Sequence, residues 1–156
     1  MGRRRTEETM IGDIEVSCQT HGALDAHELL VDLANAVGGA VTTIADALEK
    51  DAEISALSGM FTAIDAKVTR GLIVRILRHT RATYHKEDGT KLSTELSSEK
   101  AFELVFGDDL MAVYTAVKFA LQVNYSGFFD VLVDAYNQTR ASVDESSKSP
   151  KESSSN

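Results

Sequence analysis

The sequence has one cysteine, one proline and no long apolar run. Because Cys18 has no second cysteine to pair with, an internal disulfide is excluded and a reducing compartment is expected. No stretch reaches the roughly 20 consecutive apolar residues that a membrane helix needs. The basic start at residues 1–5 is followed by the polar residues 6–9, where a signal peptide would be apolar. We therefore expect a cytoplasmic protein that does not bind membranes.

Motifs for catalysis and for cofactor or metal binding are also missing. The sequence has no phosphate-binding loop and no G-x-S-x-G nucleophile motif. No two histidines lie three or four residues apart on a predicted helix; they are His21, His27, His79 and His85. The adjacent Asp108 and Asp109 point in different directions on a helix, which makes a joint acid-base role geometrically poor. The sequence predicts no enzyme, no metal site and no cofactor.

The charge and composition are those of an acidic globular protein. Its 156 residues suit one domain with a substantial core, and 43% of them are hydrophobic. The net charge of −8 argues against nucleic acid as the main partner, because phosphates repel an acidic surface. The same charge suits a protein that stays dispersed while it holds an apolar client.

Both ends of the chain are predicted to be irregular. Residues 1–9 show no apolar periodicity and are expected to form a flexible basic arm. Its Arg3, Arg4 and Arg5 are expected to lie in solvent, with contact to nucleic acid or to an acidic partner as the alternatives. Residues 144–156 contain no apolar side chain and include the only proline, Pro150, so a disordered tail is expected. The domain itself is predicted over residues 10–143.

One segment has the periodicity of a strand. Ile14, Val16 and Cys18 alternate with polar residues within the segment 10–19. A strand needs a partner for its backbone groups, and the best internal candidate is the segment 84–96, which has a turn signal at residues 87–89. A copy of the same strand in a homo-oligomer, or a strand of another protein, remains an alternative.

Helical periodicity covers most of the remaining chain. The first helix is expected to start at Asp25, with Glu28 completing a capping box, and Gly38-Gly39 either ends it or marks a close crossing. Further helices are predicted over 41–48 and 54–64, over a segment that contains 68–77, and over one that contains 101–106; the expected caps are Asp51, Asp65 and Ser97 or Ser98, and Gly107 ends the last helix. The helix after Asp65 carries a basic face that suits solvent, an acidic partner or a second copy of the chain; it consists of Lys67, Arg70, Arg75 and Arg78.

The most apolar stretch, residues 108–137, reads as two helices joined by a break at 124–127. Its first helix is apolar around most of its circumference and leaves only a narrow polar strip, formed by Thr115, Lys118 and Gln122. Such a helix must be covered on more than one side. The predicted fold class is therefore predominantly α-helical, with about six helices and one short strand or hairpin near the N-terminus.

The segments Phe106-Gly107-Asp108 and Val123–Phe129 resemble the C-terminal signature of tail assembly chaperones of long-tailed bacteriophages. The similarity in layout extends over about residues 10–137. It implies a protein that binds and solubilises the tape measure protein and helps to recruit tail tube subunits. The expected partner-binding residues, each of which suits a core role equally well, are Tyr114, Phe119, Tyr125, Phe128 and Phe129. The alternatives are a structural head-tail or tail-completion protein and a self-associating helical regulatory module.

Overall fold

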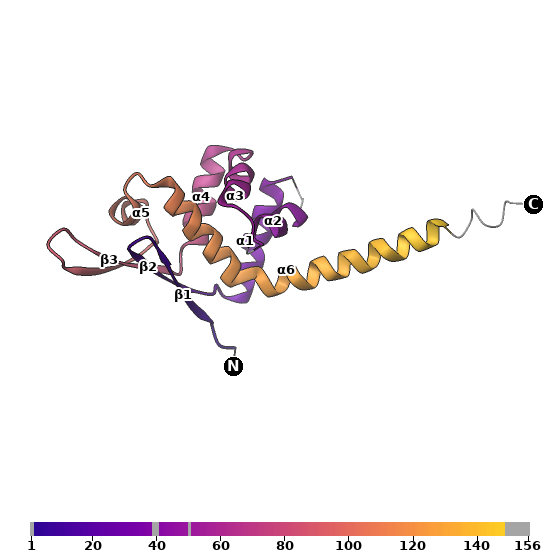
Figure 1. The fold of residues 1–156 in the computed structure, drawn as a ribbon, viewed down its shortest axis with the longest axis horizontal. Helices are drawn as coiled ribbons and strands as arrows, with labels where there is room; N and C mark the ends of the chain where they lie inside the picture. The colour runs from indigo at the N-terminus through magenta and orange to yellow at the C-terminus, as the bar shows by residue number, and fades with distance from the viewer. Residues whose placement is uncertain (1, 39–40, 50, 149–156) are drawn as a thin grey trace, which may run out of the picture. The chain divides into compact units, whose positions relative to one another are not determined.

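The computed structural model describes residues 2–38, 41–49 and 51–148 of the chain. The chain divides into two compact units, residues 1–124 and residues 125–156. The first unit contains a four-stranded sheet and most of the helices (Figure 1). The elements in chain order are β1 (Thr6–Ile11), β2 (Ile14–Gln19), α1 (Ala23–Ala36), α2 (Val41–Ala47), α3 (Ile54–Thr62), α4 (Ala66–Ile76), β3 (Thr80–His85), β4 (Lys91–Glu95), α5 (Glu99–Phe106) and α6 (Leu110–Lys148).

The four-stranded sheet shows that the predicted fold class, predominantly α-helical with one short strand or hairpin, is wrong. Its strands lie in the order β1-β2-β3-β4, and every neighbouring pair is antiparallel. The central pair joins β2 to β3, with Val16 opposite Ala82 and Cys18 opposite Thr80. The predicted strand in 10–19 therefore exists over β2, but its partner begins four residues before the expected segment 84–96. That segment instead supplies the end of β3, the predicted turn and β4, so the fold mixes a sheet with helices.

The structure has a hairpin where the sequence predicted a short strand or a hairpin, but its first strand was not located, because the turn is short and that strand is polar. Gly12 and Asp13 connect β1 to β2, and Gly12 has a φ of 58°, which suits the first central position of a tight hairpin turn. Strand β1 includes residues 6–9, which were predicted to belong to an irregular arm. At the edge of the sheet β1 needs little apolar character, so periodicity did not reveal it.

One face of the sheet packs into the core. Val16, Cys18 and Ala82, on neighbouring strands, are fully buried. The opposite face is polar, and Arg81 there forms an ion pair with Glu95 at 2.8 Å across the β3–β4 ladder. The alternation of buried and polar positions is the pattern of an antiparallel sheet with one face in solvent.

Within the first unit, the initial turns of α6 run between the sheet and the helices α2 and α3 (Figure 1). Ala116, Val117, Ala120 and Leu121 have no exposed surface. This confirms that the helix is covered on more than one side. The predicted polar strip lies inside the fold, because Lys118 is 8% exposed and donates to the carbonyl of Ala52. Gln122, one turn later, donates to the Leu48 carbonyl at 2.9 Å, so both side chains satisfy carbonyl groups at and beyond the end of α2.

Several helix ends agree with the sequence. The Asp65 carboxylate accepts from the amides of Lys67 and Val68, and the Ser98 hydroxyl accepts from the Ala101 amide at 3.3 Å. Gly107 ends α5 with a φ of 57°.

Two N-terminal caps were predicted wrongly. Helix α1 begins after Gly22 without a side-chain cap, so the capping box at Asp25 and Glu28 is not formed. The N-cap of α3 is Glu53 rather than Asp51. At the other end of α1, Gly38 follows the last helical residues and has a φ of 84°. Of the two roles predicted for Gly38, the one observed is therefore that of ending the helix.

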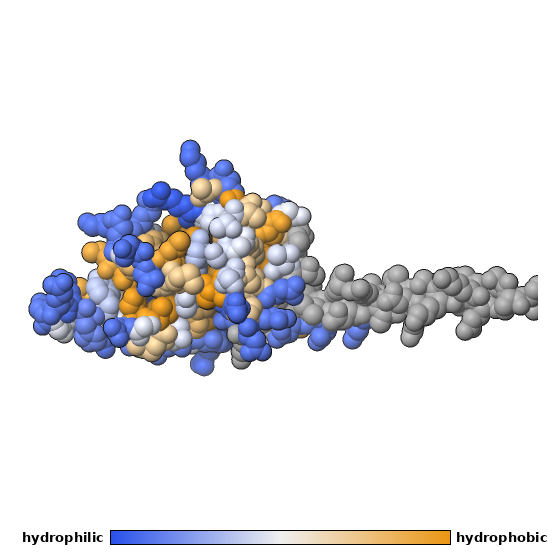
Figure 2. All heavy atoms as spheres, turned by 45° about the horizontal axis from the view of Figure 1, so that its top comes forward, coloured by the Kyte–Doolittle hydropathy of each residue, from blue (hydrophilic) through white to orange (hydrophobic). Residues whose placement is uncertain are grey.

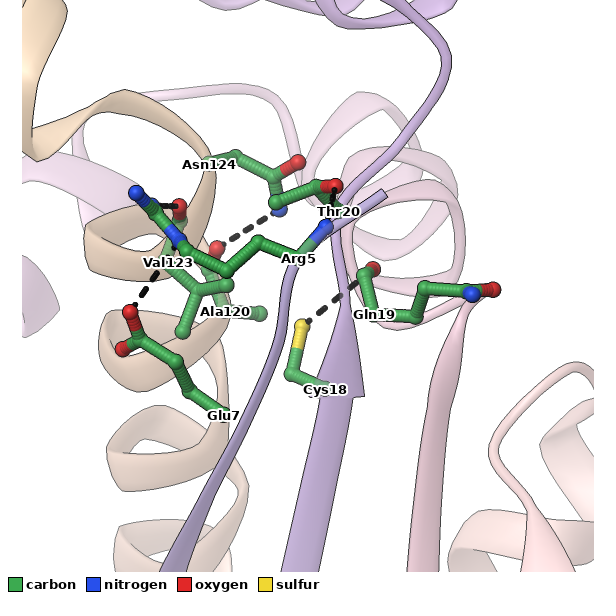
Figure 3. Close-up of polar contacts among 8 residues, drawn as sticks. All are labelled: Arg5, Glu7, Cys18, Gln19, Thr20, Ala120, Val123 and Asn124. Atoms are coloured by element: carbon green, nitrogen blue, oxygen red, sulfur yellow. Dashed lines mark hydrogen bonds and ion pairs between the residues drawn. The ribbon is translucent and has the colours of Figure 1, made fainter. Parts of the chain in front are cut away.

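The predicted break at residues 124–127 is wrong, because α6 is one helix from Leu110 to Lys148. Asn124 looked like a helix exit, but its side-chain amide forms two hydrogen bonds. Its Nδ2 donates to the Ala120 carbonyl at 2.8 Å (Figure 3). Its Oδ1 accepts from the His21 amide at 2.8 Å. In the second unit α6 continues through residues 125–148, so residues 144–148 of the predicted tail are helical. Residues 149–156 lie outside the described residues.

Candidate protein-docking surfaces

An open groove of about 500 Å³ lies between the helices of the first unit. The end of α3 and the start of α6 contribute Phe61 and Tyr114, whose rings stack with centroids 6.1 Å apart. Both rings are largely buried, at 2% and 9% exposure, and form the base of the groove. The apolar walls come from α4, α5, the start of α6 and the segment that follows α3; they include Ile64, Ile73, Val74, Phe102 and Val113. On the face shown in Figure 2, hydrophobic residues gather on the surface and hydrophilic residues surround them.

The rim of this groove carries three charged side chains. Arg70 on α4 forms an ion pair with Glu99 on α5, which raises the pKa of the arginine through that hydrogen bond and the adjacent charge. Glu103 lies one turn after Glu99 on α5 and also lines the groove. The groove is therefore apolar within and has two acidic groups against one basic group at its edge.

The second unit presents apolar side chains of its own. Phe128 is 48% exposed and Val131, three residues later on α6, is 68% exposed. Residues three apart lie on one side of a helix. Asp130 and Asp134, one turn apart, are exposed as well. This part of α6 thus has exposed apolar residues next to acidic ones.

The five predicted partner-binding residues have different environments. Tyr114 lines the groove, Phe119 is half-buried, and Tyr125 is 4% exposed. Phe128 is the most exposed of those whose side chains are described, and the side chain of Phe129 lies outside the described set. Their role in partner binding stays a prediction. The groove itself was not predicted, because its walls come from helices that are distant in sequence.

A polar cluster at the end of the first unit fixes α6 against the N-terminal hairpin. The Arg5 guanidinium donates to the Val123 carbonyl and pairs with Glu7, while the Arg5 amide donates to the Thr20 hydroxyl at 3.0 Å (Figure 3). Arg5 lies just before β1 and was predicted to belong to a flexible arm, but it links the N-terminal hairpin to α6.

His21 is the buried titratable group beside this cluster. Its Nε2 lies 3.1 Å from the Ile76 carbonyl, and its ring meets the His79 ring edge-on at 4.8 Å. Burial lowers the pKa of His21, although the hydrogen bond to Ile76 opposes the shift. Partial burial, together with Arg4 and Arg78, also lowers the pKa of His79. Both rings favour the neutral form.

The basic face predicted on α4 is partly neutralised by ion pairs within the first unit. Arg70 pairs with Glu99, and Arg75 pairs with Asp32 of α1 at 2.7 Å. Lys67 and Arg78 are exposed. Two of the four basic residues therefore hold α4 against α5 and α1, which makes this face a weak candidate for an acidic partner.

Over the described residues, His, Cys, Asp and Glu side chains do not gather into any group of three or more that could hold a metal ion. None of the described helices combines the length and the apolar character required to cross a bilayer. The features that stand out are the groove and the exposed apolar residues of α6, and both are suited to contact with another protein.

Comparison with known families agrees with this interpretation. The family described as "Phage tail assembly chaperone protein, TAC" matches the chain over residues 12–137. This protein therefore belongs to the phage tail assembly chaperone family, whose role is not enzymatic. No curated protein and no solved structure matches the chain. The resemblance stated from residues 106–108 and 123–129 is confirmed at the level of the family.

Proposed function

We propose that this chaperone binds the tape measure protein in the cytoplasm of the host cell, keeps it soluble, and helps to bring tail tube subunits to it. The observation that carries the proposal is the exposure of Phe128 and Val131 on α6, in a chain that belongs to the tail assembly chaperones. Large apolar side chains on one side of a helix are the anchors used when a helix packs against a partner.

The charge of the chain supports the same role. A client with long apolar helices aggregates through its exposed stripes, and covering a stripe with apolar anchors removes that surface from water. The net charge of −8 then keeps the complex dispersed. Asp130 and Asp134 lie near the anchors and place negative charge close to the covered surface.

The test replaces Phe128 with Ser and measures how much co-expressed tape measure protein stays in solution. We expect the melting temperature to remain close to that of the parent, since Phe128 is already 48% exposed, while the soluble client falls severalfold. The matched control is Leu24→Ser on α1, where an 85% exposed apolar residue is lost from another element. Phe129→Ser, made alongside, tests the neighbouring predicted contact.

Two results would count against the proposal. Client that stays soluble with the Phe128 variant would show that this part of α6 is not a binding surface. An equal loss with Leu24→Ser would show that any reduction in surface hydrophobicity has the effect. Mass spectrometry of purified particles adds an independent check, because a chaperone is absent from the finished virion.

A further inference from the structure

The groove between α4, α5 and α6 collects apolar side chains that the fold leaves half-buried. Ile73, Phe102 and Val113 lie on three different helices, line the same hollow, and are each neither fully covered nor fully exposed. Leu110, one turn before Val113 and Tyr114 on α6, is 58% exposed and extends the apolar surface at one end. Apolar surface that is concentrated in this way marks an interaction site.

The walls of the groove decide which backbone conformation a peptide ligand can have. They consist of α4, α5, the end of α3, the start of α6, and the connection between α3 and α4. No sheet edge is among the residues that line it. An extended peptide needs backbone partners, as it finds at a sheet edge, whereas a helix satisfies its own N–H and C=O groups and needs only side-chain contacts. An α-helix is therefore the peptide conformation that this groove fits.

The rim decides the charge of the ligand. Arg70 is already paired with Glu99, and no ion pair joins Glu103 to another described residue. The three rim charges sum to one negative charge, within a chain of net charge −8. A basic residue on the ligand, placed beside its apolar stripe, complements Glu103.

We propose that this groove binds an amphipathic helix of the client that has apolar residues three and four apart and a lysine or arginine beside them. The proposal rests on the proposed function, since it names the part of the client that the first unit holds. The groove is distinct from the Phe128 surface, because all its lining residues lie within residues 61–114. The chaperone thus has two client contacts that can be removed separately.

The direct test is a binding titration of the full-length protein with designed peptides of about 18 residues, long enough to form a helix. One peptide has leucines at helical spacing, flanking lysines and one tryptophan; its twin has glutamates in place of the lysines. Because the protein contains no tryptophan, selective excitation of the peptide reports binding without a background from the chain. We expect the lysine peptide to bind more tightly than the glutamate peptide.

Two groove variants and one control locate the site. Glu103→Lys should lower the affinity for the lysine peptide by about two- to fivefold, as expected for one exposed charge pair, and should raise the affinity for the glutamate peptide. Ile73→Gln should lower the affinity for both peptides by about fivefold or more, because an apolar contact is lost. Glu8→Lys, an exposed charge reversal on β1, should leave both affinities unchanged. Thermal melts of each variant establish that it is folded.

The outcomes separate this proposal from the proposed function. If Glu103→Lys and Ile73→Gln fold normally and leave the peptide affinities unchanged, the groove is not a helix-binding site. That conclusion holds whatever effect Phe128→Ser has on the amount of soluble client. Equal binding of the two peptides overturns the assigned charge. If the parent protein is a dimer and Ile73→Gln makes it monomeric, the groove is occupied by a second copy of the chain, and the client assignment is overturned. Loss of soluble tape measure protein with Ile73→Gln, in parallel with weaker peptide binding, supports the proposal.

Discussion

Replacing Gly107 with Ala should destabilise the fold through backbone strain alone. Gly107 has a φ of 57° and a ψ of −119°, a combination that residues with a side chain rarely adopt. A Cβ placed on Gly107 would meet no atom within 4 Å, so no steric clash with a neighbour contributes. Holding a non-glycine residue in such a region costs about 1–3 kcal/mol. Gly107→Val should cost more, because a β-branched residue is more restricted.

Gly71 provides a matched control, because the same change there should have the opposite sign. It lies in α4, is exposed, and has open space around the position of a Cβ. Alanine in an exposed helix is more stable than glycine by about 0.5–1 kcal/mol. Both variants add one methyl group in open space. The difference between their free energies of unfolding therefore reports the effect of the backbone conformation at each glycine.

Urea unfolding followed by circular dichroism measures this difference. With a slope of about 2 kcal/mol per molar urea, a cost of about 2 kcal/mol lowers the midpoint by about 1 M. Gly71→Ala should raise the midpoint by about 0.3–0.5 M. If Gly107→Ala left the midpoint unchanged or raised it, the chain would not have the sharp turn between α5 and α6, and the reasoning would fail.

Three further predictions concern the described contacts and the tail. The free energy of unfolding should fall as the pH drops below about 6.5, the pKa of His21 in the unfolded chain, because the folded state has a lower pKa and the unfolded state then binds more protons. In urea titrations between pH 7.5 and 5.5, His21→Gln should reduce the dependence of the unfolding free energy on pH, and an unchanged dependence would contradict this prediction. Asn124→Ala should cost about 1–3 kcal/mol, measured by urea unfolding, because the His21 amide loses its acceptor; a cost near zero would show that this contact contributes little. Deleting residues 144–156, which have no apolar side chain, should leave the melting temperature almost unchanged, and a clear fall would show that this segment packs.

Local chemistry in the sequence predicted local structure well. Asp65 and Ser98 act as caps and Gly107 ends a helix, because each effect depends on hydrogen bonds or backbone angles within a few residues. The buried stripe of α6 was also visible, since helical periodicity records which side chains face the core. The alternation of Val16 and Cys18 likewise located β2.

Features that depend on distant partners were predicted wrongly or missed. Asn124 has the chemistry of a helix exit, but the His21 amide, 103 residues away, satisfies it within the helix. Lys118 and Gln122 looked like a polar strip and instead bind carbonyls of the 48–52 region. Strand β1 has its backbone satisfied by β2, so its polar side chains gave no sign of a strand. The groove could not be foreseen, since its shape depends on the packing of α4 against α5 and α6.

Four helices, α1–α4, separate β2 from β3 in the sequence, and this order has a consequence for the rate of folding. The β1–β2 and β3–β4 hairpins each join strands that are close in sequence and can form quickly. The central ladder pairs residues 15–18 with residues 80–83, so it requires closure of the chain that contains α1–α4. Loop-closure entropy makes such a pairing slow unless the intervening helices are already compact. Folding of the sheet should therefore follow folding of the helices, and on the ribosome β2 must wait for β3 to emerge.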